Sequence, residues 1–160
     1  MAKKAIKKTS SSSFLKSAIG HHEALKLIYP SVGSTRIPDN AVFFAFYNVF
    51  GFALELYFKA FLSSKAKTIE ELSQYPYSHN LKNLLDACKE LSIFDYHGRP
   101  DVDPSAIEKI VSIVGPHFSD MTYRYIDDDN DTYTYIETMD LVWPVLDDLR
   151  IRIEASGVKA

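Results

Sequence analysis

The fold is decided by the segment Ala41-Val-Phe-Phe-Ala-Phe-Tyr-Asn-Val-Phe-Gly-Phe-Ala-Leu-Glu-Leu-Tyr-Phe-Lys-Ala-Phe-Leu62. A helix that is apolar on nearly every side belongs in the core of a helical bundle. The same length suits a membrane span. Glu55 and Lys59 argue against a span, because each charged side chain at mid-membrane costs at least about 2.5 kcal/mol on insertion scales. We therefore predict a soluble, mostly α protein, an up-and-down bundle of about five helices around this central helix.

The composition indicates one small domain without cofactors. The chain has 160 residues and is 46% hydrophobic. A domain of this length buries roughly 70% of its unfolded surface without help from a metal or a disulfide. The single cysteine, Cys88, suits a reducing compartment. Residues 1–13 are basic and serine-rich and lack the apolar core of a secretory signal. We expect a disordered tail over 1–13, one domain over 14–156, a cytoplasmic location, no cofactor and no membrane association.

Apolar spacing and turn residues predict further helices on both sides of the central one. One helix, or two short ones, spans Phe14–Tyr29 and ends before Pro30, because the residue before a proline avoids helical geometry. Thr68 and Glu71 have the spacing of a capping box. Further helices are expected over Asn80–Leu91, from Pro104 to Val114 with an end at Gly115-Pro116, and over Glu137–Ala155 with Trp143-Pro144 at a kink or first turn.

Two short segments near the C-terminus have a different pattern. Met121–Ile126 and Thr132–Ile136 alternate with the period of a strand and are rich in aromatic and β-branched residues. The acidic run Asp127-Asp-Asp-Asn-Asp131 lies between them and favours a turn. We predict a short extended or β-hairpin segment near 121–136 that packs on the bundle, because a lone two-stranded hairpin is marginal in water.

Three polar side chains share one stripe of the central helix. Asn48, Glu55 and Lys59 project within about 40° of one another when each residue turns the helix by about 100°. Glu55 and Lys59 have the favourable order for an ion pair within a helix. Partly buried charges often belong to functional sites. Two interpretations remain open: the stripe forms a ligand site, or it only holds neighbouring helices in register.

A second group of polar residues opens the helix expected after residue 80. In Ser78-His-Asn-Leu-Lys82, the free amides of the helix start, His79 and Lys82 are suited to hold an anion such as phosphate. The alternative is structural: Ser78 caps the helix, and His79 is an ordinary, partly exposed imidazole. Both interpretations stay open from the sequence.

Arg124 is flanked by aromatic residues. It lies between Tyr123 and Tyr125 in the second half of the chain. An arginine in such a setting can stack on a base and pair with a phosphate group. It can equally bind Glu55 or another carboxylate, so Arg124 is a candidate for a site and for a structural ion pair.

Other ligand motifs are missing from the sequence. A calcium hand loop needs Gly at its sixth position and Glu at its twelfth, and counting from Asp127 those positions hold Thr132 and Thr138. The histidines lack a zinc-ligand pattern with cysteine, and no glycine-rich phosphate loop occurs. The net charge of −3 argues against broad affinity for nucleic acid. We expect no metal site.

Three motifs, taken in order, resemble the HEPN domains, the higher eukaryote and prokaryote nucleotide-binding helical family. They are Asn48-x6-Glu55-Leu-x-x-Lys59-Ala, His79-Asn-Leu-Lys-Asn-Leu-Leu85 and Arg124-Tyr125. The resemblance spans the region from Ala41 to Arg152. It implies a small helical bundle that forms a homodimer, with ligand-binding residues at Asn48, Glu55, Lys59, His79, Lys82, Arg124 and Tyr125.

Many proteins of that family cleave RNA as toxins or defence nucleases, with a motif of Arg, four to six residues and His. Here Asp129, Asn130 and Asp131 stand at those offsets after Arg124. The resemblance therefore implies a non-catalytic module that binds a nucleotide, RNA or a protein partner such as a nucleotidyltransferase, as in toxin–antitoxin or defence systems. An RNA-cleaving enzyme with a degenerate site and a purely structural dimerising protein are the alternatives.

Overall fold

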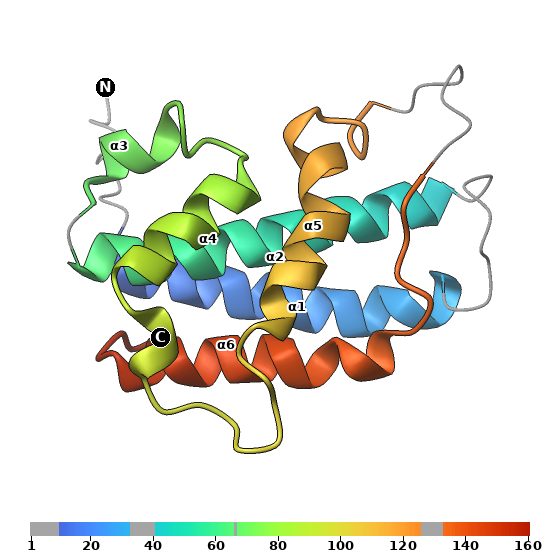
Figure 1. Cartoon of the computed structure of the whole chain (residues 1–160). Coiled ribbons are helices and arrows are strands. Elements are labelled where there is room, and N and C mark those ends of the chain that lie inside the picture. Colours follow the sequence, from blue (N-terminus) through green and yellow to red (C-terminus); the bar gives the residue numbers. More distant parts are fainter. Residues whose placement is uncertain (1–9, 33–40, 66, 126–132) are drawn as a thin grey trace, which may run out of the picture.

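The central segment forms α2 (Ala41–Lys65), around which the other described helices gather in the computed structural model (Figure 1). The structure describes residues 10–32, 41–65, 67–125 and 133–160. The other helices are α1 (Ser11–Val32), α3 (Ile69–Ser73), α4 (Leu81–Glu90), α5 (Ala106–Ser119) and α6 (Trp143–Ala155), with 3-10 turns η1 (Ile93–Asp95) and η2 (Met139–Leu141). The prediction of a mostly α bundle around a central apolar helix is confirmed.

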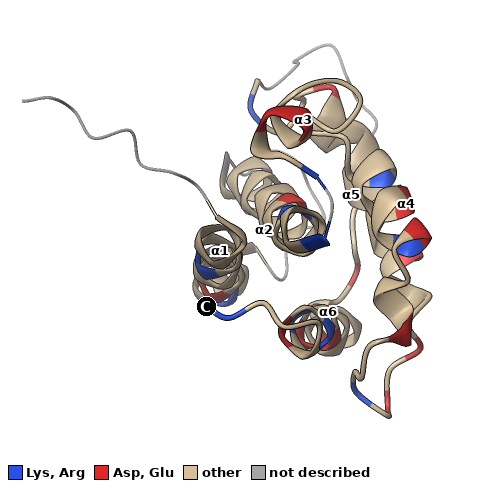
Figure 2. Cartoon of the chain, turned by 90° about the vertical axis from the view of Figure 1, so that its left-hand side faces the viewer, with Lys and Arg blue, Asp and Glu red and all other residues tan. Residues whose placement is uncertain are grey.

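α2 contributes a row of aromatic side chains to the core. Figure 2 shows α1, α2 and α6 nearly end-on, with α4 and α5 along one side of them, and α2 contacts all four. The buried rings of α2 are Phe43, Phe44, Phe46, Tyr47, Phe50, Tyr57, Phe58 and Phe61. Burying a large apolar side chain contributes about 1.5–3 kcal/mol, so α2 is the element on which the rest of the bundle packs.

α2 is also long and apolar enough to cross a membrane. In the bundle, 67% of the apolar stretch that lies within Val42–Lys65 is buried inside the protein. Its charged residues Glu55 and Lys59 bind each other inside the protein. An all-round apolar helix buried in this way is typical of the centre of a helical bundle.

Two prolines lie inside helices, so the helix ends predicted before them are wrong. α1 runs through Pro30 to its end, and α5 runs through Pro116 to its end. A proline removes one backbone hydrogen bond and crowds the preceding turn. Beyond each proline, however, a side chain is buried: Val32 is 7% exposed and Phe118 is 1% exposed. Packing of these side chains extends both helices. α1 is also one helix rather than two.

The observed helices begin next to residues suited to a helix start, and some of these starts differ from the predicted positions. Thr68 caps α3 in the predicted capping box. α4 begins after Asn80, whose side chain accepts a backbone N–H of the first turn, so Ser78 and His79 are not the cap. α6 has Pro144 in its first turn, where the missing N–H of a proline does no harm. It begins later than predicted because η2 precedes it.

The predicted β-hairpin is absent from the described residues on either side of the acidic run. Met121–Tyr125 forms a turn closed by its own backbone hydrogen bonds. Ile136 donates its N–H to the Tyr47 hydroxyl at 2.7 Å. Tyr123 is 3% exposed. Tyr123, Tyr133 and Tyr135 therefore pack on the bundle instead of pairing as strands. Residues 126–132, with the acidic run, lie outside the described residues.

Candidate functional site

The site is built on a buried ion pair within α2. Lys59 Nζ donates to Glu55 Oε1 at 2.5 Å, and Glu55 is 3% exposed. His79 Nδ1 lies 3.1 Å from the other oxygen, Oε2. A buried charge is tolerated when it is paired and hydrogen-bonded. The Glu55 carboxylate meets that condition with one partner from its own helix and one from the segment before α4.

His79 reaches this carboxylate with a left-handed backbone. Its φ is 53°, a conformation that costs a residue other than glycine about 1–3 kcal/mol. The Ser119 hydroxyl, at the end of α5, donates to the His79 carbonyl at 2.8 Å. Residues in such conformations persist where the surrounding structure holds them, and they cluster at functional sites. The observed backbone thus directs the imidazole toward α2 and marks His79 as a functional candidate.

Arg124 approaches the same group from the turn after α5. Its Nε donates to Asn48 Oδ1 at 3.4 Å, and its Nη2 lies 3.5 Å from His79 Nδ1. The guanidinium carbon lies 4.6 Å from the centre of the Phe52 ring and 5.8 Å from that of Phe118. A cation over an aromatic ring gains about 0.5–2 kcal/mol, more where water is excluded. Two rings and the Asn48 amide therefore hold the guanidinium in place.

The neighbours of His79 also decide where its proton lies. Nδ1 faces the Glu55 carboxylate at 3.1 Å and the Arg124 guanidinium at 3.5 Å. A carboxylate accepts hydrogen bonds and a guanidinium only donates them, so Nδ1 can serve one of the two. The shorter contact and the negative charge of Glu55 favour an N–H at Nδ1, an assignment made from the hydrogen-bond geometry. Nε2 then carries the lone pair, on a side chain that is 30% exposed.

The cluster holds more positive than negative charge. Glu55 binds Lys59 and His79. In the part of the chain that the structure describes, no carboxylate pairs with Arg124, whose polar neighbours are an amide and an imidazole. A planar guanidinium with free N–H groups matches the oxygens of phosphate and carboxylate ligands. The arrangement is therefore a candidate anion site.

Phe118 supports this site from one side. Its ring lies edge-on to Phe52 and to His79, with centres 5.2 and 5.9 Å apart. It also lies directly on Gly51, where an added Cβ would clash with the Phe118 ring. Sequence reasoning missed these supporting residues. The available signal was the glycine itself, because an isolated glycine in a helix of bulky residues often marks a close approach.

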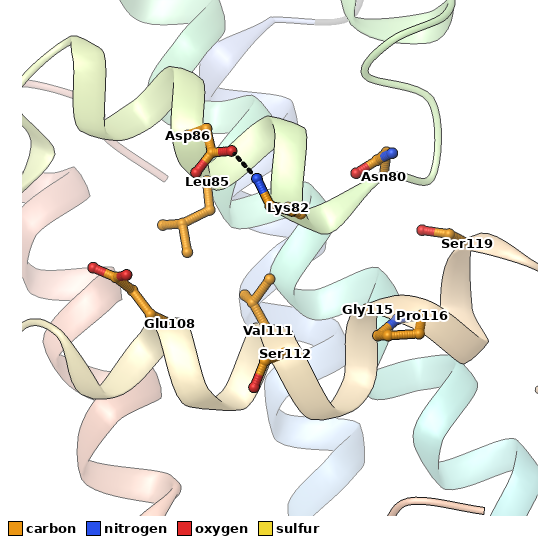
Figure 3. A pocket seen from close by; sticks show the side chains of 10 residues that line it. All are labelled: Asn80, Lys82, Leu85, Asp86, Glu108, Val111, Ser112, Gly115, Pro116 and Ser119. Atoms are coloured by element: carbon orange, nitrogen blue, oxygen red, sulfur yellow. Dashed lines mark hydrogen bonds and ion pairs between the residues drawn. The ribbon is translucent and has the colours of Figure 1, made fainter.

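Two predicted site residues lie outside the bonded cluster. Lys82 pairs with Asp86 at 2.6 Å, and its side chain is 78% exposed. Both residues line an open groove of about 370 Å³ between α4 and α5 (Figure 3). Tyr125 is 73% exposed. The residues that the structure does bring together are Asn48, Glu55, Lys59, His79 and Arg124.

A second buried ion pair is structural. Arg152 on α6 donates to Asp148 at 2.7 Å and to the carbonyls of Phe94 and Tyr96 at 2.8 and 2.6 Å. The other Asp148 oxygen accepts the N–H of Arg99 at 2.6 Å. Each charged group there is satisfied by the protein, so the pair fastens the segment after α4 to α6. Sequence reasoning missed it, although the four-residue spacing of Asp148 and Arg152 was a signal for the pair; the carbonyl partners are far away in the chain.

The described residues contain little that suits a metal site or a reactive thiol. No group of three or more His, Cys, Asp and Glu side chains among them is placed to hold a metal ion. Burial raises the pKa of the Cys88 thiol, and its Sγ lies 3.8 Å from the Phe58 carbonyl oxygen. The thiol is therefore protonated and acts as a small core group.

No protein-family model, no curated protein and no solved structure matches this chain significantly. The protein is a mostly α-helical bundle in which a buried Glu–Lys pair supports a partly exposed His–Arg pair.

Proposed function

We propose that the protein is a non-catalytic, HEPN-like binding module that holds a phosphate group of a nucleotide or RNA on Arg124 and His79. One observation carries the proposal: Arg124 is fixed on the Phe52 ring and has no carboxylate partner in the described residues. A guanidinium that is ordered before the ligand arrives loses less conformational entropy on binding. The order of the sequence motifs, which resembles the HEPN family, supports the same function.

The donor groups around Arg124 suit a phosphate. Its Nε donates to Asn48, and the Nδ1 proton of His79 is directed at Glu55, which leaves the N–H groups of Nη1 and Nη2 for a ligand. Lys59 adds a second positive charge to the cluster, although it is only 9% exposed and is bound to Glu55. Arg–phosphate hydrogen bonds are charge-assisted and about twice as strong as neutral ones. A phosphate on Arg124 would thus balance the excess positive charge of the cluster.

An Arg124→Ala variant is expected to bind a fluorescein-labelled, 5′-phosphorylated single-stranded RNA at least tenfold more weakly than the parent chain. The loss corresponds to about 1.4 kcal/mol, because one charge-assisted contact disappears. Fluorescence anisotropy across a salt series measures it, and the slope of log K against log salt should fall by about one. Lys82→Ala is the matched control, since Lys82 is exposed and paired with Asp86.

Three results would count against this function. Equal affinity of Arg124→Ala and parent chain would remove Arg124 from the site. A larger loss in Lys82→Ala than in Arg124→Ala would move the binding site to the groove between α4 and α5. If neither RNA nor nucleotides bind and the protein is a dimer in light scattering, the purely structural role is the better description.

A second function is favoured by the contact between Glu55 and His79. An imidazole whose Nδ1–H is held by a carboxylate at 3.1 Å presents Nε2 as a base, as in hydrolytic triads. In an RNA-cleaving enzyme, Nε2 would take the proton of a ribose 2′-hydroxyl as that oxygen attacks phosphorus. The bond from phosphorus to the 5′-oxygen would break, leaving a 2′,3′-cyclic phosphate, and the departing 5′-oxygen would take a proton from water. Arg124 would stabilise the charge that develops on the phosphate.

The two functions are separated by a His79→Asn variant. Asparagine tolerates the left-handed backbone that His79 adopts, so the fold is retained while the imidazole is lost. RNA that is degraded by the parent chain and spared by His79→Asn identifies the enzyme. RNA that stays intact with both proteins, but binds less tightly to Arg124→Ala, supports the non-catalytic module.

A further inference from the structure

His22 is a buried histidine that does not belong to the site described above and precedes all of its residues in the sequence. It lies on α1, is 1% exposed, and its Nδ1 is 3.0 Å from the Tyr57 hydroxyl of α2. Its other ring nitrogen, Nε2, is buried without a hydrogen-bond partner. The nearest carboxylate is that of Asp147 on α6, with Oδ1 3.9 Å from Nε2. A buried polar atom without a partner is uncommon in native proteins and calls for an explanation.

The neutral ring has a preferred arrangement of its proton. Nε2 faces a carboxylate, so an N–H at Nε2 is favoured over a lone pair, and Nδ1 then accepts from the Tyr57 hydroxyl. A proton from solvent would bind at Nδ1. It would reverse the hydrogen bond with Tyr57 and place a full positive charge within 4 Å of Asp147. Asp147 could then close the remaining gap to Nε2.

Asp147 has a competing partner. Its Oδ2 lies 3.6 Å from Arg99 Nη1, and its side chain is 39% exposed, so it is free to shift. Arg99 would remain held after such a shift, because its side chain binds Asp101 and its backbone N–H binds Asp148. The carboxylate thus stands between a permanent cation on one side and a titratable imidazole on the other.

The charged and titratable groups that act on His22 come from three helices. They are Glu23 and Lys26 of α1, Tyr57 of α2, and Asp147 and Arg150 of α6. Burial is the largest effect and lowers the pKa of His22, and Lys26 and Arg150 lower it further, whereas Asp147 and Glu23 raise it. The protein therefore keeps His22 neutral near pH 7, and a fall in pH works against that state.

We propose that His22 is a proton-sensitive latch between α1 and α6: when it takes up a proton, Asp147 pairs with its Nε2 and leaves Arg99. The device couples acidification to the contact between Asp147 and Arg99, which lies in the segment that joins α4 to α5. It does not depend on the phosphate-binding function proposed above, since none of its residues belongs to that site.

The protein contains its own reporter for this event. Trp143 is the single tryptophan of the chain, and its ring lies nearly parallel to His22, at 12° with centres 6.1 Å apart. A protonated imidazole quenches indole fluorescence more strongly than a neutral one. The fluorescence of the full chain from pH 8 to pH 5 therefore follows the protonation of His22, while far-UV circular dichroism shows that the bundle stays folded.

The expected result is a single decrease in fluorescence with a midpoint below 6.5, the ordinary pKa of histidine. In Asp147→Asn the midpoint should fall by roughly one pH unit, because the favourable carboxylate is lost. In Arg99→Gln it should rise, because Asp147 loses its competing cation. His22→Gln should show no transition. The unfolded chain takes up this proton more readily than the folded one, so the latch also lowers stability progressively as pH falls below 6.5.

Three results would overturn the latch. They are a transition that persists in His22→Gln, an unchanged midpoint in Asp147→Asn, and a parent chain whose fluorescence stays constant until circular dichroism reports unfolding. If His22→Gln fails to fold, the opposite shifts in Asp147→Asn and Arg99→Gln decide the question alone, because both side chains are partly exposed.

Discussion

A Glu55→Ala variant is expected to lose about 3 kcal/mol of unfolding free energy, a large part of the stability of a domain of this size. The substitution removes the acceptor of Lys59 and the partner of His79 together. Lys59 is 9% exposed, so its ammonium group would remain in the bundle without a counter-ion. A buried charge without a partner is among the few causes of such large effects. Urea denaturation followed by circular dichroism measures the change.

A matched control lies on the protein surface. Arg150 and Glu154 form an ion pair on α6 and are four residues apart, as Glu55 and Lys59 are on α2. Their side chains, however, are 39% and 38% exposed. Glu154→Ala should change the unfolding free energy by less than about 0.5 kcal/mol. A Glu55→Ala effect as small as that of Glu154→Ala would mean that the Glu55 stripe faces water and is no part of a buried site.

A double variant separates the structural role of the pair from its role in the site. Replacing a buried ion pair by apolar residues of similar size is often neutral for stability. Glu55→Leu with Lys59→Met should therefore recover most of the stability that Glu55→Ala loses. His79 would lack its hydrogen-bond partner in this double variant as in Glu55→Ala, so we expect both variants to bind the phosphorylated RNA more weakly than the parent chain. Full recovery of both properties would show that the pair only fixes helix packing.

The part of this site that the sequence predicts is the part that lies within one helix. Helical periodicity is enough to place Asn48, Glu55 and Lys59 on one stripe. It is also enough to predict that α2 forms the core, because a helix that is apolar on all sides must be buried. The ion pair between Glu55 and Lys59 was expected on the same grounds and is present.

The rest of the site depends on contacts between distant segments, which periodicity does not describe. His79 meets Glu55 through a left-handed backbone, and Arg124 meets Asn48 across a turn that was predicted to be a strand. Lys82 shows the converse. Its place at the start of α4 suggested an anion site, but Asp86, four residues later, satisfies it locally. Lys82 therefore lies outside the bonded cluster, in a pair that the spacing of the two residues along α4 favours.

A Gly51→Ala variant should be destabilised by about 1–3 kcal/mol and should bind the phosphorylated RNA more weakly. The new methyl group would clash with the ring of Phe118, so that ring must move. Phe118 contacts both His79 and Arg124, so its displacement changes the distance between the two groups proposed to hold phosphate. Thermal unfolding and fluorescence anisotropy measure the two effects on the same protein.

Gly20→Ala provides the opposite case. Gly20 lies in α1, is exposed, and has nothing within 4 Å of an added Cβ. Alanine is favoured over glycine in a helix by about 1 kcal/mol, so this variant should be as stable as the parent chain or more stable, with unchanged binding. The same substitution thus has opposite signs at two helical positions, and the ring of Phe118 is the physical difference. If Gly51→Ala were stabilised like Gly20→Ala, Phe118 would be free to move without cost, and it could not be what holds His79 and Arg124 in place.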